Sequence, residues 1–207
     1  MNKADEKIFV IDDDASVRRS LPLLLKASDY NVETFSSSEE FLNRDVFYGT
    51  GCIILDINLE GKSGLELQDE LINKPYYLPI IFITGKGGVP ESVQALKKGA
   101  IDFLQKPFND EQILSAVKEA ITKSHEIKKE YDEIKFLQKL ISKLTERELE
   151  VFKYVVTGML NKEIADQLNI AEHTVKIHRG KITEKLGVKS VAELVRIAEK
   201  LGIRSPT

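Results

Sequence analysis

Apolar residues in the first 120 positions fall into short, nearly continuous runs, and longer stretches with helical spacing separate these runs. Such runs are typical of strands that are covered on both faces in a parallel sheet. The pattern predicts five strands, at residues 7–12, 31–35, 52–57, 80–84 and 101–104. The helices between them are expected at residues 16–27, 38–43, 64–73 and 90–98. Repeated strand–helix units need right-handed crossovers, so we expect an α/β fold with a doubly wound, five-stranded parallel sheet.

From residue 109 onward the pattern is helical. Asn109 and Gln112 have the spacing of a capping box, and the helix that starts there meets no Gly or Pro before residue 144. Five apolar residues of this stretch occupy two positions of a seven-residue repeat: Ile127, Ile134, Ile141, Leu137 and Leu144. Two heptads fit a solvated amphipathic linker helix about as well as a functional helix, which would be a short coiled-coil dimer seam or a signalling stalk, so these interpretations stay open.

Four further helices are expected in the last part of the chain, at residues 145–157, 162–168, 172–186 and 190–201. Thr145 and Glu148 have a second capping-box spacing, which marks the start of this helical unit. A turn of three residues, 169–171, separates the second of these helices from the third. A short turn between two helices is typical of the helix-turn-helix, whose second helix enters the DNA major groove.

The composition is that of an ordinary globular protein, with 42% hydrophobic and 30% charged residues, which argues against a mainly disordered chain. Cys52 is the only cysteine, so an intrachain disulfide and a cysteine metal cage are excluded. No apolar run approaches the roughly 18 residues that a membrane-spanning helix needs, and the N-terminus lacks a signal-peptide core. We therefore expect a cytoplasmic protein that has no membrane partner.

The net charge of −3 conceals an asymmetry along the chain. Residues 1–122 carry 13 Lys and Arg against 20 Asp and Glu, a charge of −7, whereas residues 123–143 and 144–207 each carry +2. An acidic front part and a mildly basic back part suggest two functions. The chain is therefore expected to consist of a domain at 1–122, a helical linker at 123–143 and a helical domain at 144–207.

Polar side chains follow four of the predicted strands, namely Asp12, Asp13, Asp14, Asp56, Thr84 and Lys106. The carboxyl ends of parallel strands meet at one edge of a doubly wound sheet, so these side chains should lie together. Clustered carboxylates repel each other unless water, a lysine or a cation neutralises them, and Mg²⁺ suits such a place. Each Asp could instead cap the following helix, an interpretation that suits Asp14 best, but caps would not explain Thr84 and Lys106.

Four runs carry a resemblance to a known family: I-D-D-D from Ile11, I-L-D-I-N-L-E-G-K-S-G from Ile54, I-T-G-K-G from Ile83 and K-P-F from Lys106. In order and spacing they resemble the receiver domain of two-component response regulators, a flavodoxin-like fold, over about residues 5–123. The resemblance implies that Asp56 accepts a phosphoryl group from a sensor histidine kinase. It also implies a Mg²⁺ cofactor that is held by Asp13 directly, by Asp12 through water, and by Asp56 and the Asn58 carbonyl.

The same resemblance implies roles for further residues at this edge. The Thr84 hydroxyl would move toward the phosphoryl group, Lys106 would form an ion pair with that group, and Phe103 would be an aromatic switch. Pro107 would follow a cis peptide bond. The added charge would then reshape the surface around the fourth and fifth strands.

A second class of proteins also uses an Asp nucleophile, namely Mg²⁺-dependent phosphohydrolases of the haloacid dehalogenase type. These enzymes share a second Asp, two residues after the nucleophile, that acts as a general acid. This chain has Asn58 at that position, and an amide cannot donate a proton as a carboxylic acid does. The phosphohydrolase stays as an alternative, and we expect a chain that is not an enzyme apart from slow self-dephosphorylation.

Three runs carry a second resemblance: L-T-E-R-E-L-E-V from Leu144, G-M-L-N-K-E-I-A from Gly158 and T-V-K-I-H-R-G-K-I from Thr174. They resemble the LuxR-like helix-turn-helix of NarL/FixJ-type regulators over about residues 142–203, and the stretch 84–100 is most similar to the FixJ branch. The resemblance implies that Lys176 and Ile177 contact bases. Five residues would contact phosphates or the backbone around them: Lys162, Thr174, Arg179, Lys181 and Lys185.

Together the two resemblances imply a phosphorylation-controlled transcription regulator that binds double-stranded DNA. The apolar residues of the final helix could pack on their own domain or pair with a second copy, and the resemblance implies the second, a homodimer on phosphorylation or DNA binding. Two alternatives stay open for the second part of the chain. Its Lys and Arg side chains could merely solvate a helix face, and the chain could be a protein-interaction regulator that does not bind DNA.

Overall fold

A computed structural model describes residues 6–74, 76–85 and 89–204 of the chain. Residues 86–88 of the stretch that resembles the FixJ branch, and residues 1–5 of the N-terminus, lie outside this part. The chain divides into two compact units, 1–131 and 132–207, and the division falls inside the predicted linker. No helix of the described part is long and apolar enough to cross a membrane.

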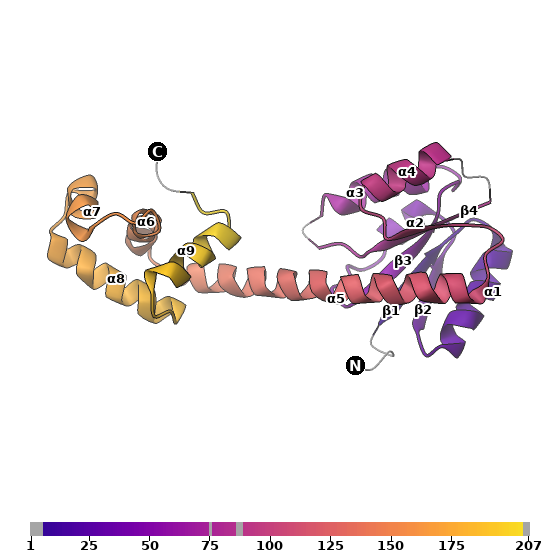
Figure 1. The fold of residues 1–207 in the computed structure, drawn as a ribbon, viewed down its shortest axis with the longest axis horizontal. Helices are drawn as coiled ribbons and strands as arrows, with labels where there is room; N and C mark the ends of the chain where they lie inside the picture. Colours follow the sequence, from indigo (N-terminus) through magenta and orange to yellow (C-terminus); the bar gives the residue numbers. More distant parts are fainter. Residues whose placement is uncertain (1–5, 75, 86–88, 205–207) are drawn as a thin grey trace. The chain divides into compact units, whose positions relative to one another are not determined.

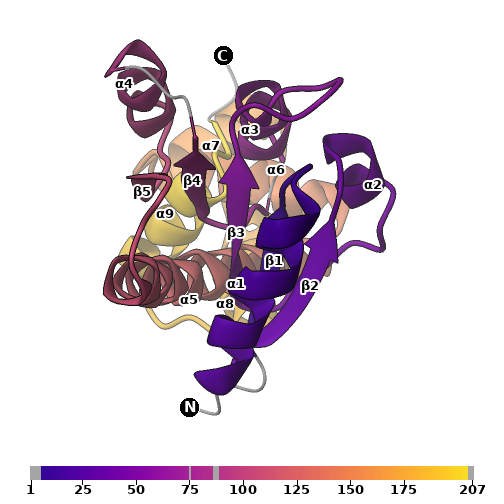
Figure 2. The same cartoon turned by 90° about the vertical axis from the view of Figure 1, so that its right-hand side faces the viewer.

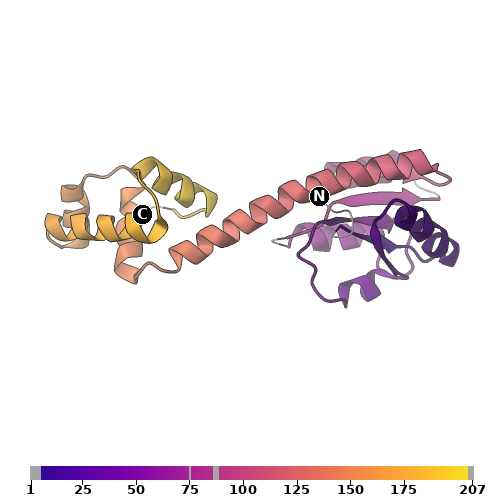
Figure 3. The ribbon, with the colours of Figure 1, turned by 90° about the horizontal axis from the view of Figure 1, so that it is seen from below.

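Helix α5 (Asp110–Ile141) begins in the first unit and ends in the second without a break (Figures 1 and 3). The Asn109 side chain accepts a hydrogen bond from the Gln112 amide, and the Asn109 amide donates to the Gln112 side chain. The predicted capping box is therefore confirmed. The absence of Gly and Pro lets the helix continue through the whole predicted linker.

The first unit is built on a five-stranded parallel sheet with the strand order β2-β1-β3-β4-β5 (Figure 2). Its strands are β1 (Lys7–Ile11), β2 (Asn31–Phe35), β3 (Gly51–Asp56), β4 (Ile80–Thr84) and β5 (Asp102–Gln105). Its helices, besides α5, are α1 (Ala15–Ala27), α2 (Ser38–Leu42), α3 (Gly64–Ile72) and α4 (Val89–Lys97). The predicted doubly wound α/β fold is confirmed, and each predicted boundary lies within two residues of the observed one.

Alternate residues of the strands enter different cores, as the two-residue period of a strand requires. Phe9 of β1 belongs to a core that includes Phe41 of α2 and Leu67 of α3. Its neighbour Val10 belongs to a second core, which includes Leu25 of α1 and the first part of α5. Because both faces of the sheet are covered, the central strands β3 and β4 are buried along their whole length, whereas the edge strands β2 and β5 carry polar residues.

The strand register brings the polar residues to one edge of the sheet. Asp12 directly follows β1, and the register between β1 and β3 brings it level with Asp56. Thr84 ends β4 and lies opposite Gln105, the residue before Lys106. These residues are far apart along the chain, and the parallel pairing alone sets them side by side.

The second unit is helical, with α6 (Glu146–Val155), α7 (Asn161–Leu168), α8 (Glu172–Leu186), α9 (Val191–Lys200) and the end of α5. Thr145 caps α6 in a complete capping box with Glu148, as the spacing predicted. The turn between α7 and α8 begins at Asn169, whose φ of 51° lies in the left-handed region that Asn tolerates. One apolar core joins the four helices through Phe152, Ile164, Ile182 and Ile197. The predicted helix-turn-helix is therefore confirmed.

The linker part of α5 uses its apolar residues within the two units. Ile127 packs against a core of the first unit, and Leu137, Ile141 and Leu144 pack against the core of the second. Of the five residues in the seven-residue repeat, Ile134 alone joins neither core in the described part of the chain. These contacts support the linker-helix interpretation, and the coiled-coil seam stays a hypothesis.

Candidate functional site

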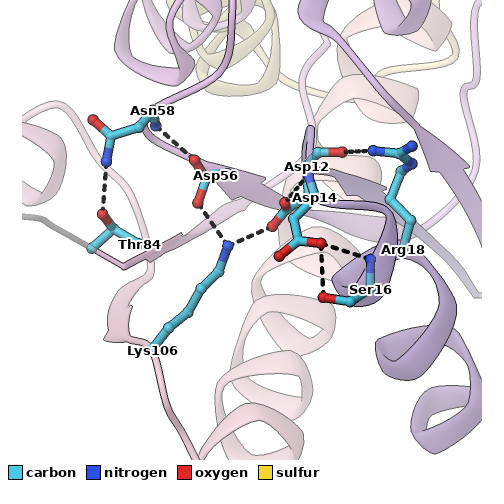
Figure 4. Close-up of polar contacts among 8 residues, drawn as sticks. All are labelled: Asp12, Asp14, Ser16, Arg18, Asp56, Asn58, Thr84 and Lys106. Carbon is cyan, nitrogen blue, oxygen red and sulfur yellow. Dashed lines mark hydrogen bonds and ion pairs between the residues drawn. The ribbon is translucent and has the colours of Figure 1, made fainter.

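Three charged side chains meet at the carboxyl edge of the sheet, as Figure 4 shows. The Lys106 Nζ lies 2.7 Å from Asp12 Oδ2 and 2.9 Å from Asp56 Oδ1. Asp12 and Asp56 are buried, with 0% and 4% of their surfaces exposed. One ammonium thus bridges two buried carboxylates, and all three belong to the set that the sequence placed at this edge.

Burial and pairing shift the pKa values of this cluster. Burial raises the pKa of Asp12, although hydrogen bonds from Lys106 and from the Asp14 amide act in the opposite direction. Burial alone would lower the pKa of Lys106, but its hydrogen bonds to Asp12 and Asp56 outweigh this effect and raise the pKa. Lys106 is therefore a fixed positive charge beside Asp56 at neutral pH.

Asn58 connects Asp56 to Thr84. Its backbone amide donates to Asp56 Oδ2 at 2.7 Å, and its side-chain amide donates to Thr84 Oγ1 at 3.0 Å (Figure 4). Thr84 is buried at the end of β4. Both oxygens of Asp56 are engaged, one with Lys106 and one with Asn58, and this fixes the orientation of the carboxylate.

The acidic run after β1 divides into separate roles. Asp14 caps α1, because its carboxylate accepts from both the amide and the hydroxyl of Ser16 at 2.7 Å, so the capping interpretation is confirmed for this residue. Asp13 is exposed. Sequence reasoning missed Arg18, whose guanidinium donates to the Asp12 carbonyl at 2.6 Å. The sequence did offer a signal for this contact, because a basic residue stands in the helix that directly follows the acidic run.

The oxygen donors at this edge suit a hard divalent cation that brings part of its own shell. Asp12 and Asp56 present carboxylate oxygens near one point, since both reach the same Lys106 nitrogen. Among the residues that the structure describes, no three His, Cys, Asp or Glu side chains form a group that could hold a metal. The Asp13 carboxylate therefore does not join those of Asp12 and Asp56 in a group of three. Mg²⁺ commonly takes one or two carboxylates and completes its shell with waters and phosphate oxygens, which fits these donors.

Close packing fixes the loop after Asp56. Gly64, the first residue of α3, has no room for a side chain, because a Cβ there would lie 2.3 Å from the Asp56 carbonyl oxygen. Gly64 ends a run that the sequence already marked, but its close contact with the Asp56 backbone was not predictable.

Two further residues of the predicted set lie in β5 and directly after it. The Lys106–Pro107 peptide bond is cis, as predicted. Phe103 lies half-buried in β5 and packs against the core that includes α2 and α3.

Four of the residues that are predicted to contact DNA are exposed on the helix-turn-helix. Lys176, Ile177 and Lys181 are exposed on α8, and Ile177 leaves 45% of its surface open although it is apolar. Lys162 is exposed in the first turn of α7, whereas Thr174 is half-buried near the start of α8. This surface combines cations with one apolar side chain, the composition that contacts to phosphates and to a thymine methyl need.

Two predicted phosphate contacts are engaged inside the second unit. The Arg179 Nη1 donates to Asn161 Oδ1 at 2.9 Å, which ties α8 to the first residue of α7. The Lys185 Nζ lies 2.5 Å from Oε2 of the buried Glu148 and 3.1 Å from the Lys143 carbonyl oxygen. Lys185 therefore neutralises a buried carboxylate within the unit. Asn161 was not singled out by sequence reasoning, because a neutral residue in a first helical turn gives no sign of a partner on another helix.

Two family models match separate parts of the chain. The model described as a response regulator receiver domain matches residues 8–118. The model described as bacterial regulatory proteins of the luxR family matches residues 142–198. The two matches correspond to the sheet unit and to the helix-turn-helix unit, in the order that the sequence predicted.

Relatives are similar along nearly the whole chain. Nodulation protein W of Bradyrhizobium diazoefficiens is 42% identical over 196 residues, which cover 95% of this chain and 86% of that protein. The transcriptional regulatory protein FixJ of Azorhizobium caulinodans is 40% identical over 95% of this chain and 93% of its own length. The solved structure of the response regulator StyR is 41% identical, with a TM-score of 0.76 over 95% of this chain and 99% of that one. The chain therefore belongs to the two-component response regulators that join a receiver domain to a LuxR-type DNA-binding domain.

Proposed function

We propose that this response regulator accepts a phosphoryl group on Asp56 and that phosphorylation controls DNA binding by its second unit. The observation that carries the proposal is the contact of Lys106 with both Asp12 and Asp56 at the edge of the sheet. An Asp56 oxygen attacks phosphorus while the phosphorus–nitrogen bond to a kinase histidine breaks, and the imidazole leaves with the kinase. Lys106 stabilises the negative charge on the phosphoryl oxygens during this transfer.

Mg²⁺ is the cofactor of this proposal, held by Asp12, Asp13, Asp56 and the Asn58 carbonyl. When bound, it neutralises charge on the phosphoryl oxygens. The charge balance at the site supports this assignment, because Lys106 brings one positive charge to two buried carboxylates. An incoming phosphoryl group adds further negative charge that Lys106 alone would not offset.

The added phosphoryl oxygens give Thr84 a new partner. Its hydroxyl accepts a hydrogen bond from Asn58 in the structure, and it would turn to donate to the phosphoryl group. Phe103 lies half-buried in the neighbouring strand β5, and it would occupy the space that Thr84 leaves. The surface around β4 and β5 would change as a result.

The proposed DNA contact is made by α8 in the major groove, with Lys176 and Ile177 at the bases. Lys185 is left out of the proposed contacts, because its ammonium is held by the buried Glu148. The proposed phosphate contacts are Lys162, Thr174, Arg179 and Lys181.

Labelling with acetyl phosphate and Mg²⁺ tests the phosphoacceptor. We expect about one phosphoryl group per chain, lost in Asp56→Asn and retained in the control Asp29→Asn. Asp29 is exposed and has a φ of 68°, a conformation that Asn tolerates, so the control removes a carboxylate without disturbing the fold. Labelling that survives Asp56→Asn would reject the proposal.

The same assay addresses the alternative of a Mg²⁺-dependent phosphohydrolase. Many turnovers of a phosphate ester per chain would favour that enzyme over stoichiometric labelling. The relatives support the regulator, because FixJ is named a transcriptional regulatory protein and StyR a response regulator. Slow loss of the label to water is expected from the regulator itself.

Binding to a duplex selected from randomised DNA tests the second unit. Lys176→Ala should weaken binding by about 1–3 kcal/mol and relax the base preference at one position. Lys139→Ala is the matched control, because Lys139 is exposed on α5, outside the helix-turn-helix. No duplex affinity of the unaltered chain at low salt would favour a protein-interaction regulator instead.

The proposal includes a sensor histidine kinase as phosphoryl donor, a cytoplasmic location and a homodimer on phosphorylation or DNA binding. The homodimer is proposed through α9, of which Leu194, Ile197 and Ala198 pack in the core of the second unit and Val191 keeps 39% of its surface exposed. The domain borders at residues 122 and 143 are part of the proposal as well.

A further inference from the structure

A glycine interrupts the middle of α8. Gly180 is the ninth of the 15 residues of this helix. Glycine in a helix interior destabilises the helix by about 1 kcal/mol relative to alanine, because it loses more backbone entropy on folding. Such a residue needs a reason in the packing, in the backbone conformation or in a contact with another molecule.

Neither packing nor backbone conformation requires Gly180 to be a glycine. A Cβ at this position would meet no other atom within 4 Å, in contrast to Gly64, where it would meet the Asp56 carbonyl oxygen at 2.3 Å. Among the glycines of the described chain, Gly180 is not one of those with a positive φ, in contrast to Gly187 at the end of the same helix. The second unit would therefore accept an alanine at residue 180 without strain.

The surroundings of Gly180 are the surface that the proposed function assigns to DNA. Lys176 and Ile177 lie one helical turn earlier and Lys181 directly follows, and all three are exposed. On the opposite side of Gly180 along the chain, Arg179 is fixed by its hydrogen bond to Asn161. Gly180 is thus a low point within a positively charged surface, at the centre of the helix.

We propose that Gly180 is the place where α8 comes closest to the DNA, and that the missing side chain sets how deeply the helix enters the groove. The inference rests on the proposed DNA contacts of α8. A methyl group at this position would hold the helix away from the groove. Lys176 and Ile177 would then lose contacts with base edges, because hydrogen bonds weaken within a few tenths of an ångström.

Gly180→Ala and Gly180→Leu in the full chain test the inference, with a duplex selected from randomised DNA by the unaltered chain. We expect Gly180→Ala to bind this duplex at least threefold more weakly, and Gly180→Leu to bind it more weakly still. The unfolding temperature of the second unit should stay equal or rise in Gly180→Ala, because alanine favours the helix. Loss of affinity without loss of stability separates a DNA contact from a structural role.

A change of less than threefold in Gly180→Ala, or a gain in affinity, overturns the inference and leaves the proposed DNA binding intact. If the unaltered chain binds no duplex, the proposed DNA contacts and the inference fail together. Labelling of Asp56 by acetyl phosphate serves as the control for each variant, since residue 180 lies in the other unit. Equal labelling shows that the chain is otherwise unchanged.

Discussion

Lys106 and Lys185 both place an ammonium on a buried carboxylate, and their surroundings separate a site from a structural pair. Lys106 bridges Asp12 and Asp56, so one positive charge faces two negative charges. Lys185 pairs with one carboxylate, that of Glu148, and the same Glu148 oxygen accepts from the Thr145 amide at 2.8 Å. The second pair is neutral and belongs to a capping box, whereas the first keeps an excess of negative charge at the edge of the sheet.

Acid should weaken the second unit through Glu148. Hydrogen bonds from Lys185 and from the Thr145 amide hold the pKa of Glu148 below its ordinary value of 4.5. The ionised carboxylate therefore stabilises the folded state above the unfolded pKa, and this share is lost as pH falls toward the lower folded pKa. We expect the unfolding temperature of the second unit to fall between about pH 5 and pH 3, and less steeply in Glu148→Gln.

Calorimetry of the full chain at several pH values measures this dependence. Glu146→Gln is the matched control, because Glu146 is exposed in the first turn of the same helix. It should keep the pH dependence of the unaltered chain. Equal slopes in Glu148→Gln and in the unaltered chain would show that the Lys185 pair contributes nothing to acid sensitivity.

Among the elements, α5 is held on the first unit by an aromatic cluster near the end of that unit. The ring of Tyr131 stacks on Tyr48 with 5.9 Å between centroids and 15° between planes, and it lies 4.9 Å from the ring of Tyr76. The Tyr76 hydroxyl donates to the Gly49 carbonyl at 2.5 Å. Tyr48 and Tyr76 precede β3 and β4 in the chain, so the cluster joins α5 to two loops.

Removing one ring of this cluster should loosen α5. Tyr131→Ala is expected to destabilise the first unit by about 1–3 kcal/mol, because the stacked pairs and the buried ring area are lost. Amide exchange near residues 125–131 should become faster, which hydrogen-exchange mass spectrometry measures. Tyr131→Phe keeps the ring and is the control, so the same loss in both variants would contradict a role for stacking.

For the whole molecule, the packing of the apolar linker residues decides whether α5 has a free apolar face through which two copies could pair. Four of the five residues in the seven-residue repeat pack within the two units, which leaves Ile134. Phe136 is a further apolar residue of this stretch, with 60% of its surface exposed. Two such side chains on one helix are fewer than a coiled-coil seam needs.

Ile134→Asp combined with Phe136→Asp should therefore leave the mass of the protein in solution unchanged. Sedimentation with and without phosphorylation measures this. Ile141 is spared in the variant, because it packs against the core of the second unit and an aspartate there would damage the fold. A dimer that becomes a monomer in this variant would restore the seam hypothesis.

Much of the fold was predictable because its signals are local. Apolar runs, capping boxes at Asn109 and Thr145, and the turn at 169–171 depend on residues within a few positions of each other, and the structure confirms them. The aromatic cluster at Tyr131 was not predictable, since ring contacts between loops follow no helix or strand period. The contact of Arg179 with Asn161 escaped for the same reason, because it joins two helices.

By itself, the sequence determined the order of the elements, the two family resemblances and the set of polar residues at the edge of the sheet. Only the tertiary structure decided which of these residues pair. Lys106 meets Asp56 and Asp12 across separations of 50 and 94 residues, and Lys185 meets Glu148 across 37. The physical reason is distance, because a hydrogen bond or ion pair forms within a few ångströms, and only the folded chain brings such distant residues that close.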